Sequence, residues 1–297
     1  MSGAALEDVR TPTGPAFADA VTFAFGDASA QLFGLARIGL SPGADGSGPQ
    51  ASALAVLFSG REPVAAIARG GLEIAAGAGW DAISAGGLRM EVREPLQDWS
   101  VEMEGSEHAF ELRFQALSPP ALIGADDAIA RAGGMEGYEQ LCGVSGSVRT
   151  GGRTAQVRCL GQRGHAWGEP DWERIESART VCAWPGEGFG LTLASVRPVG
   201  ATHAEEPAWA ALLDEKGTLP VEDPRMSTTY DVDGRQRRAG LELWIDSEEQ
   251  PLRGSGEVLC GSTLDLGALR LDCAFFRWRI EGQEGVGRYD VLRRAAG

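Results

Sequence analysis

Short runs in which apolar and polar residues alternate recur along the chain and predict β-strands. Two examples are Ala-Val-Thr-Phe-Ala-Phe at 20–25 and Gly-Leu-Thr-Leu-Ala-Ser-Val at 190–196, and glycines separate many such runs. Helical periodicity is confined to two short stretches, 126–132 and 208–214, which we expect to be connecting helices or turns. The pattern therefore predicts an all-β protein.

The two halves of the chain carry similar landmarks in the same order. The matching pairs are 33–42 with 189–198, Gly60-Arg61 and 71–74 with Gly234-Arg235 and 240–243, and Leu88 to Trp99 with Leu269 to Trp278. An ordered series of matches indicates internal duplication more strongly than one match does. We therefore expect two tandem lipocalin-like antiparallel barrels or sandwiches, because curling a sheet removes its exposed edges.

An unmatched stretch between the halves sets the predicted domain borders. Residues 124–134 are polar, rich in glycine and helix-like, which suits a linker. A hairpin pattern follows, turns at 150–153 and leads into 161–172. We therefore expect an N-terminal domain over 1–123, a linker over 124–134 and a C-terminal domain over 135–297.

Composition narrows the class of protein. Apolar residues make up 43% of the chain and charged residues 23%, which is ordinary for a globular protein. The formal net charge of −15 and the lack of a basic stripe argue against binding to nucleic acid. Because no apolar run is long enough for a membrane span and the N-terminus lacks a signal-peptide pattern, we expect a cytoplasmic protein.

The cysteines and histidines show no metal-binding or disulfide pattern. Five cysteines lie far apart without a Cys-x-x-Cys pair, so we expect reduced, buried thiols. The three histidines also lack the spacing of metal ligands, and we expect no metal site.

The segment 161–172, Gly-Gln-Arg-Gly-His-Ala-Trp-Gly-Glu-Pro-Asp-Trp, concentrates chemically active residues and is predicted to be a loop. His165 could exchange protons at neutral pH, with Glu169 or Asp171 orienting its ring. Trp167 and Trp172 could form apolar walls of a site.

Structural roles fit the same residues. His165 could bond backbone at a strand junction, the two tryptophans could pack between domains, and Asp171 could cap the turn before Trp172. Arg163 could pair with Glu169 or Asp171. Tyr138 and Tyr230 are candidate proton relays or strand-rim residues.

The motif His165-Ala-Trp167-Gly168 resembles the His-x-Trp-Gly signature of the lipocalin-like superfamily that includes carotenoid 1,2-hydratases, AttH-like proteins and fungal decalin-forming Diels–Alderases. The resemblance to uncharacterised bacterial members, which carry the pattern Arg-Asp-His-Ser-Trp-Gly-x-Arg-Asp-Trp, extends over 138–198 and more weakly across the full length. It implies two lipocalin-like domains and action on long apolar molecules in an internal or interdomain cavity. Gly164 stands where these relatives carry an aspartate, the natural proton donor for alkene hydration, and Pro170 replaces an arginine.

These observations predict a cofactor-independent enzyme that moves a proton in an apolar isoprenoid- or polyketide-like molecule by hydration, cyclisation or isomerisation. The predicted catalytic residues are His165, Asp171 and Glu169, and the predicted ligand-binding residues are Trp167, Trp172, Tyr138, Arg163 and Tyr230. The alternative is a non-catalytic binding protein for a hydrophobic ligand. A purely apolar cavity would favour this alternative, whereas convergent polar groups would favour catalysis. The sequence leaves a homodimer open.

Overall fold

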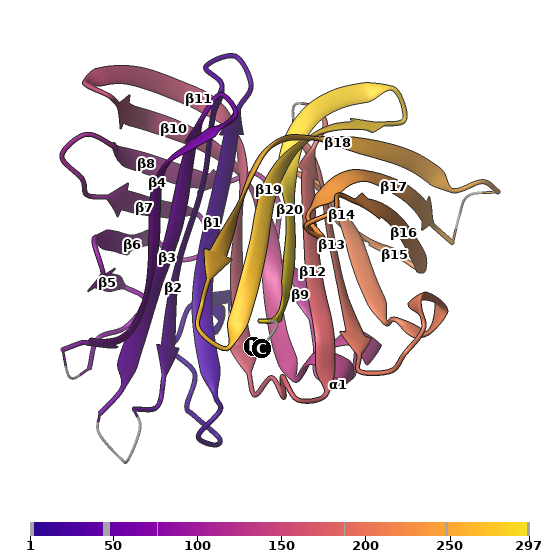
Figure 1. The fold of residues 1–297 in the computed structure, drawn as a ribbon, viewed down its shortest axis with the longest axis horizontal. Helices are drawn as coiled ribbons and strands as arrows, with labels where there is room; N and C mark the ends of the chain where they lie inside the picture. Colours follow the sequence, from indigo (N-terminus) through magenta and orange to yellow (C-terminus); the bar gives the residue numbers. More distant parts are fainter. Residues whose placement is uncertain (1–2, 44–47, 76, 187, 247–248, 296–297) are drawn as a thin grey trace.

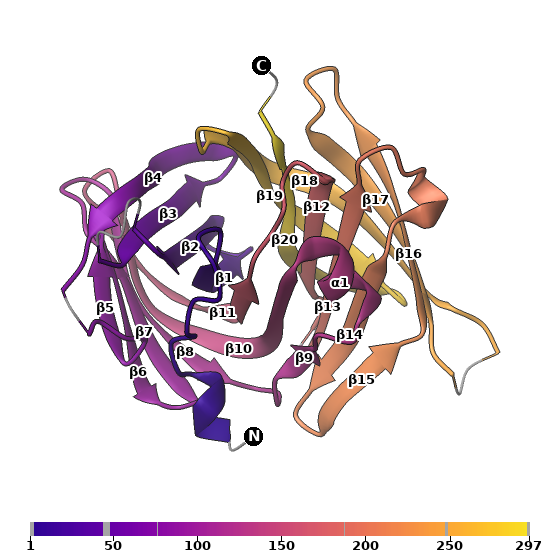
Figure 2. The same ribbon diagram turned by 90° about the horizontal axis from the view of Figure 1, so that it is seen from below.

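Two antiparallel β-sheets, each curled toward a barrel, lie side by side in the molecule (Figures 1 and 2). The structure is a computed structural model and describes residues 3–43, 48–75, 77–186, 188–246 and 249–295. The strands of 18–168 form the first barrel and those of 175–294 form the second. This architecture confirms the prediction of an all-β protein with two tandem lipocalin-like domains.

The first barrel consists of eleven strands. In spatial order these are β4 (Glu62–Glu73), β3 (Gln50–Ser59), β2 (Leu32–Ser41), β1 (Ala18–Asp27), β11 (Arg153–Gly168), β10 (Met135–Thr150), β8 (Ala109–Ala116), β7 (Asp98–Met103), β6 (Leu88–Glu94) and β5 (Ala82–Ala85), with β9 (Ala121–Ile123) beside β10. The predicted hairpin is β10–β11, which turns at Gly151 and Gly152.

The second barrel repeats the strand order of the first with nine strands. These are β15 (Gly217–Val221), β14 (Ala208–Asp214), β13 (Phe189–Pro198), β12 (Ile175–Trp184), β20 (Gln283–Arg294), β19 (Leu269–Ile280), β18 (Leu252–Asp265), β17 (Gln236–Trp244) and β16 (Asp223–Tyr230). In both barrels the first strand pairs with the last, as β1 with β11 and β12 with β20. The duplication is therefore visible in the topology.

Only one of the three predicted sequence matches joins equivalent strands. The run 33–42 starts within β2 and 189–198 is β13, each the second strand of its barrel. Gly60 lies between β3 and β4, whereas Gly234 lies between β16 and β17. Trp99 lies on β7, whereas Trp278 lies on β19, the equivalent of β10. These two matches are wrong, because similar turn and strand residues recur at positions that are not equivalent.

The chain passes between the barrels at 169–174 rather than in the predicted linker at 124–134. The linker region holds the short helix α1 (Ala128–Gly133), which ends at Gly134 in a left-handed conformation. From there β10 returns to the first sheet, where β11 pairs with β1 and completes the barrel. Residues 135–168 therefore belong to the first sheet.

The second predicted helix, 208–214, is the strand β14, so that prediction is wrong. Ala211 and Leu213 pack against residues of the first barrel, whereas Ala210 and Leu212 point into the second. A strand buried on both faces has a continuous apolar run, which periodicity cannot distinguish from a buried helix.

In the strands where the two barrels meet, successive side chains point alternately into the first barrel and toward the second barrel. On β1, Val21, Phe23 and Phe25 pack inside the first barrel, whereas Ala24 faces the second. Phe33 and Phe58 reach across to Phe275, with ring centroids 5.5 and 6.0 Å apart. The barrels therefore share a substantial apolar interface.

All five cysteines are free, and four of them are buried.

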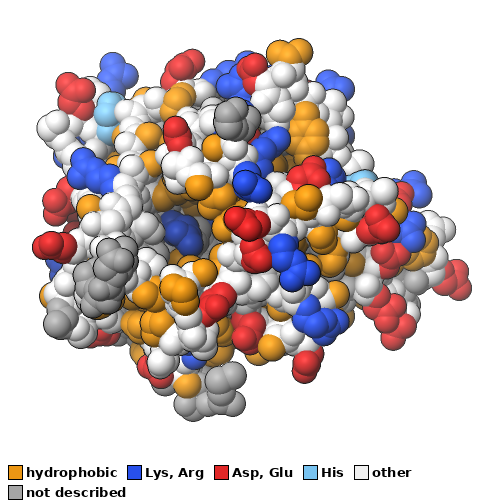
Figure 3. Space-filling view, turned by 60° about the horizontal axis from the view of Figure 1, so that its bottom comes forward, with side chains coloured by type: hydrophobic (Ala, Val, Ile, Leu, Met, Phe, Trp, Pro, Cys, Tyr) orange, Lys and Arg blue, Asp and Glu red, His pale blue; other side chains and the backbone are white. Residues whose placement is uncertain are grey.

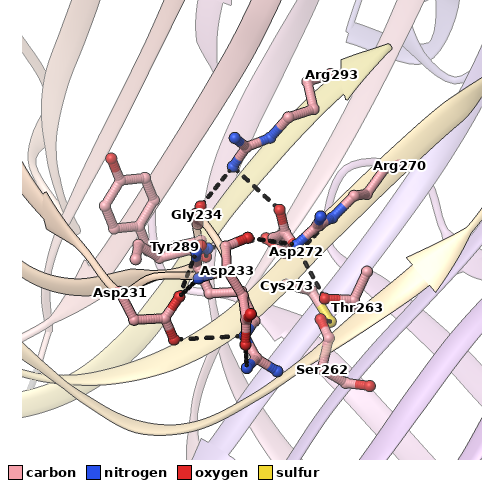
Figure 4. A network of polar contacts seen from close by, with 12 residues as sticks. Asp231, Asp233, Gly234, Ser262, Thr263, Arg270, Asp272, Cys273, Tyr289 and Arg293 are labelled. Carbon is pink, nitrogen blue, oxygen red and sulfur yellow. Dashed lines mark hydrogen bonds and ion pairs between the residues drawn. The ribbon is translucent and has the colours of Figure 1, made fainter. Parts of the chain in front are cut away.

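The buried side chain of Asp272 helps to hold one turn of the second barrel in place (Figure 4). Asp272 accepts hydrogen bonds from Thr263 at 2.6 Å and from Arg293 at 3.0 Å. Arg293 also donates to the carbonyl of Gly234 at 2.8 Å. The network therefore ties the turn between β16 and β17 to β19 and β20.

The surface shows no large patch of one charge on the face drawn in Figure 3, where acidic, basic and hydrophobic side chains are interspersed. Within the ranges that the structure describes, no helix combines the length and the apolar character needed to cross a membrane.

Candidate active site

His165 lies inside the first barrel and has no exposed side-chain surface. It is opposite Val21 of β1 and Tyr138 of β10. Its Nε2 lies 2.6 Å from Asp19 Oδ1, and its Nδ1 lies 2.9 Å from the carbonyl oxygen of Leu6. Both ring nitrogens therefore face oxygen acceptors of the protein itself, and neither is free for a ligand.

The residues around His165 hold the N-terminal segment, residues 5–17, across one end of the first barrel (Figure 2). Asp19 Oδ2 accepts hydrogen bonds from Trp80 Nε1 at 3.1 Å and from the backbone N–H of Arg10 at 2.8 Å. The Arg10 guanidinium lies 3.9 Å from the ring centroid of Trp167. At the rim, Thr13 donates to Glu169 at 2.6 Å.

Arg163 anchors the same segment from within the barrel. It forms a buried ion pair with Glu7 and donates to the hydroxyl of Tyr138. Glu7 Oε1 also accepts from the Trp99 indole at 3.1 Å, and burial raises the pKa of Tyr138 well above its ordinary value. The predicted pairing of Arg163 with Glu169 or Asp171 is wrong, because the N-terminal segment supplies the carboxylate.

The remaining predicted site residues are dispersed. Asp171 is exposed and caps its turn by accepting from the backbone N–H of Glu173 at 3.0 Å. Trp172 packs with Ile129, Ile175 and Val196. Tyr230 lies on the second barrel with 40% of its surface exposed. The segment 161–172 is mostly not a loop, because its first eight residues are the end of β11.

A cavity of about 450 Å³ lies between the two barrels. This volume falls in the range of small-molecule sites. The residues lining it include the apolar side chains Leu35, Leu54, Ile123, Ile129, Trp172, Ile175, Val196, Leu271 and Leu292. Strand β11 forms part of the wall, and the predicted site residues His165 and Tyr138 are among those that border the cavity. The two ring nitrogens of His165 nevertheless face Asp19 and Leu6 inside the first barrel.

Six charged residues from both barrels line this cavity: Arg37 of β2, Glu136 and Glu139 of β10, Arg179 of β12, and Arg288 and Asp290 of β20. Arg288 Nε lies 3.2 Å from Asp290 Oδ2. Among the described residues, Asp290 Oδ1 has no hydrogen-bond partner. Glu139 accepts from Gln162 at 2.8 Å.

Burial controls the protonation of both carboxyl groups. Desolvation raises the pKa of Asp290 to about 6, although Arg288 opposes the rise. Desolvation also raises the pKa of Glu139 above its ordinary value. An aspartic acid that titrates near neutrality at an apolar cavity is suited to exchange protons with a ligand.

Glu139 fills the space next to Gly164, the position where the resembling family carries an aspartate. The two residues are opposite each other on β10 and β11. A Cβ atom on Gly164 would lie 2.5 Å from Glu139 Oε1, so a side chain there would displace the carboxylate. The neighbouring strand therefore supplies a carboxyl group at this place in the wall.

Sequence reasoning missed all six charged residues of the cavity. Their signal is a charge inside an otherwise apolar strand, as for Arg37 in Leu-Ala-Arg-Ile-Gly-Leu and Asp290 in Tyr-Asp-Val-Leu. Such a charge needs a partner or a function, because burying it costs free energy.

A second and larger hollow, about 820 Å³, opens within the second barrel. Its central charges are paired with each other, since Arg179 donates to Glu206 at 2.8 Å and Ser195 donates to the same carboxylate at 2.7 Å. Across the described ranges, no group of three or more His, Cys, Asp or Glu side chains is arranged to hold a metal ion.

The raised pKa of Asp290 predicts how stability changes with pH in the variant Asp290→Asn. The folded state binds the Asp290 proton more tightly than the unfolded chain, so the favourable contribution is present below about pH 4 and is lost as pH rises through about 6. Relative to wild type, Asp290→Asn should therefore gain up to about 3 kcal/mol across this window. Urea unfolding at a series of pH values measures the difference, and a pH-independent difference would contradict the titration.

One protein family matches nearly the whole length of the chain. The profile described as "Domain of unknown function (DUF7064)" matches residues 7–295. No curated protein sequence matches the chain.

Solved structures share its fold at low sequence identity. A Nitrosomonas europaea protein assigned to AttH has a TM-score of 0.68 and 14% identity, covering 94% of this chain and 92% of its own. CghA with Sch210972 has a TM-score of 0.66 and 11% identity, with coverages of 95% and 90%. Kievitone hydratase from Nectria haematococca has a TM-score of 0.63 and 11% identity, with coverages of 94% and 89%. These likenesses show that the chain shares its fold with these proteins, in agreement with the predicted pair of lipocalin-like domains.

Proposed function

The chain belongs to the family of the domain of unknown function DUF7064, and on this premise we propose that it is an enzyme that moves a proton in an apolar small molecule bound between the barrels. The observation that carries the proposal is the Asp290 carboxyl group, buried at an apolar cavity with a pKa of about 6. General acids and bases work best when their pKa lies near the pH of the reaction.

In this proposal each neighbouring group has a role. Asp290 gives a proton to a carbon–carbon double bond of the substrate. Arg288, 3.2 Å away, holds the carboxyl group in place and stabilises its ionised form. Glu139 offers a second carboxyl group on the opposite wall. In a hydration, the proton adds to one alkene carbon, water adds to the other, and the carboxylate recovers a proton from that water.

Substrates of isoprenoid or polyketide type fit the lining, in which apolar surface predominates and polar groups are interspersed. Two neighbours in fold are an enzyme named kievitone hydratase and a protein solved with Sch210972, which supports a small-molecule ligand for this fold. A non-catalytic binding protein is the alternative. The charged groups favour catalysis, because a site that only stores an apolar molecule gains nothing from buried carboxyl groups.

Filling the cavity should abolish the activity. We expect wild-type protein, incubated in D₂O with a panel of isoprenoid and polyketide-derived alkenes, to place deuterium in at least one of them, as detected by mass spectrometry. Ala194 lines the cavity, so Ala194→Trp should lower the labelling rate at least about tenfold, because substrate binding supplies the positioning on which the proton transfer depends.

Val232→Trp is the matched control, since Val232 is fully exposed in a turn of the second barrel. This variant should label at the wild-type rate. Equal labelling by a correctly folded Ala194→Trp variant would remove the cavity from the reaction, and absence of labelling by wild type across the panel would count against the proposed chemistry.

A further inference from the structure

Arg37 stands apart among the three arginines that line the cavity, because Arg179 pairs with Glu206 and Arg288 with Asp290, whereas Arg37 has no counter-ion among the described residues. It lies on β2, opposite Thr22 of β1 and Leu54 of β3, and all three residues line the cavity. Within the described ranges, no carboxylate lies within ion-pair distance of its guanidinium group and no residue accepts a hydrogen bond from it. By contrast, Arg288 has Asp290 as a partner.

The surroundings of Arg37 disfavour its charge. Burial lowers the pKa of Arg37 below its ordinary value, and repulsion from Arg288 adds to this effect. Asp19 offsets it in part, but the carboxylate of Asp19 already accepts hydrogen bonds from Trp80 and from the backbone N–H of Arg10, and it contacts His165. An unpaired arginine that keeps such a position at an apolar cavity is poised for an anion from outside the protein.

We propose that Arg37 binds a carboxylate group of the substrate, so that the cavity takes an apolar molecule with an acidic end rather than a neutral hydrocarbon. This inference rests on the proposed function and names the substrate class of the same cavity. A guanidinium group can hold a carboxylate with two parallel hydrogen bonds, which fixes orientation as well as affinity.

The arrangement of the walls gives such a substrate a direction. Arg37 belongs to the first barrel, whereas Arg288 and Asp290 belong to the second. Leu54 lies beside Arg37 on the first barrel, and Leu271 and Leu292 line the cavity from the second. A molecule anchored at Arg37 therefore has apolar side chains of both barrels beside it and faces the carboxyl group of Asp290 in the second barrel.

Binding of a matched ligand pair tests the inference. Farnesoic acid and farnesol share one isoprenoid body and differ in the carboxylate and the hydroxyl group at its end. At neutral pH, isothermal titration calorimetry of the wild-type protein should show a Kd for farnesoic acid at least about tenfold below that for farnesol, as expected for a charge-assisted hydrogen bond.

The variant Arg37→Gln should lose this preference, with weaker binding of farnesoic acid and unchanged binding of farnesol, whereas Arg37→Lys should keep part of it. Arg158→Gln, an exposed arginine on β11, is the control and should behave as wild type. Circular dichroism checks that each variant is folded.

The outcomes separate the two proposals. Equal affinity of wild type for both ligands, or an unchanged preference in Arg37→Gln, would overturn the carboxylate site while leaving an apolar cavity. Failure of wild type to bind either ligand would overturn the apolar cavity as a binding site, and the carboxylate site with it.

Discussion

Replacing Asp290 with asparagine is expected to lower kcat by about 10²- to 10⁴-fold, the usual contribution of a positioned general acid or base. Asparagine keeps the size of the side chain but cannot exchange a proton at neutral pH. In wild type, kcat/KM should fall as pH rises through about 6, because the proton-donating form of Asp290 is lost there. Steady-state rates at a series of pH values measure both effects, and the variant should lack this limb of the profile.

Asp272→Asn provides the matched control for this experiment. Asp272 is also a buried aspartate of the second barrel, but its side chain bonds Thr263 and two arginines away from the cavity (Figure 4). Its variant should keep the wild-type pH profile. A folded Asp290→Asn variant with the turnover of wild type would exclude Asp290 as the proton donor.

Removing the Arg163 side chain should have the largest effect on stability. Arg163→Ala leaves the Glu7 carboxylate buried without its cation, and losing one partner of a buried ion pair costs about 3–5 kcal/mol. The contact between the guanidinium group and the Trp99 ring, 4.4 Å from its centroid, is lost as well. Thermal and urea unfolding measure the change.

Arg158→Ala tests whether this loss is specific. Arg158 lies on the same strand but is exposed, and an exposed substitution usually changes stability by less than about 0.5 kcal/mol. Equal stability losses in the two variants would show that the ion pair with Glu7 contributes nothing particular.

Much of the fold could be predicted from the sequence because alternating side chains report a half-buried strand directly. The β10–β11 hairpin shows this, since its alternation and its Gly151-Gly152 turn are both local features. The strand β14 was mistaken for a helix because both of its faces are buried. The border between the barrels was misplaced because the pairing of β11 with β1 joins residues far apart in the chain.

The site was harder to predict for a related reason. The density of functional groups drew attention to the His165 segment, and the structure gathers Tyr138, Arg163, His165 and Trp167 in one cluster. Sequence alone could not tell which face of β11 points into the barrel. The opposite face, together with β2, β10 and β20, lines the cavity, and its charged residues meet only through the packing of the two barrels.

A crystal structure of the protein with farnesoic acid tests most directly where the chemistry takes place. The ligand should lie between the barrels, with its carboxylate at Arg37 and its chain running toward Asp290. A ligand within the first barrel beside His165, or within the second barrel at Arg179 and Glu206, would contradict a site between the barrels.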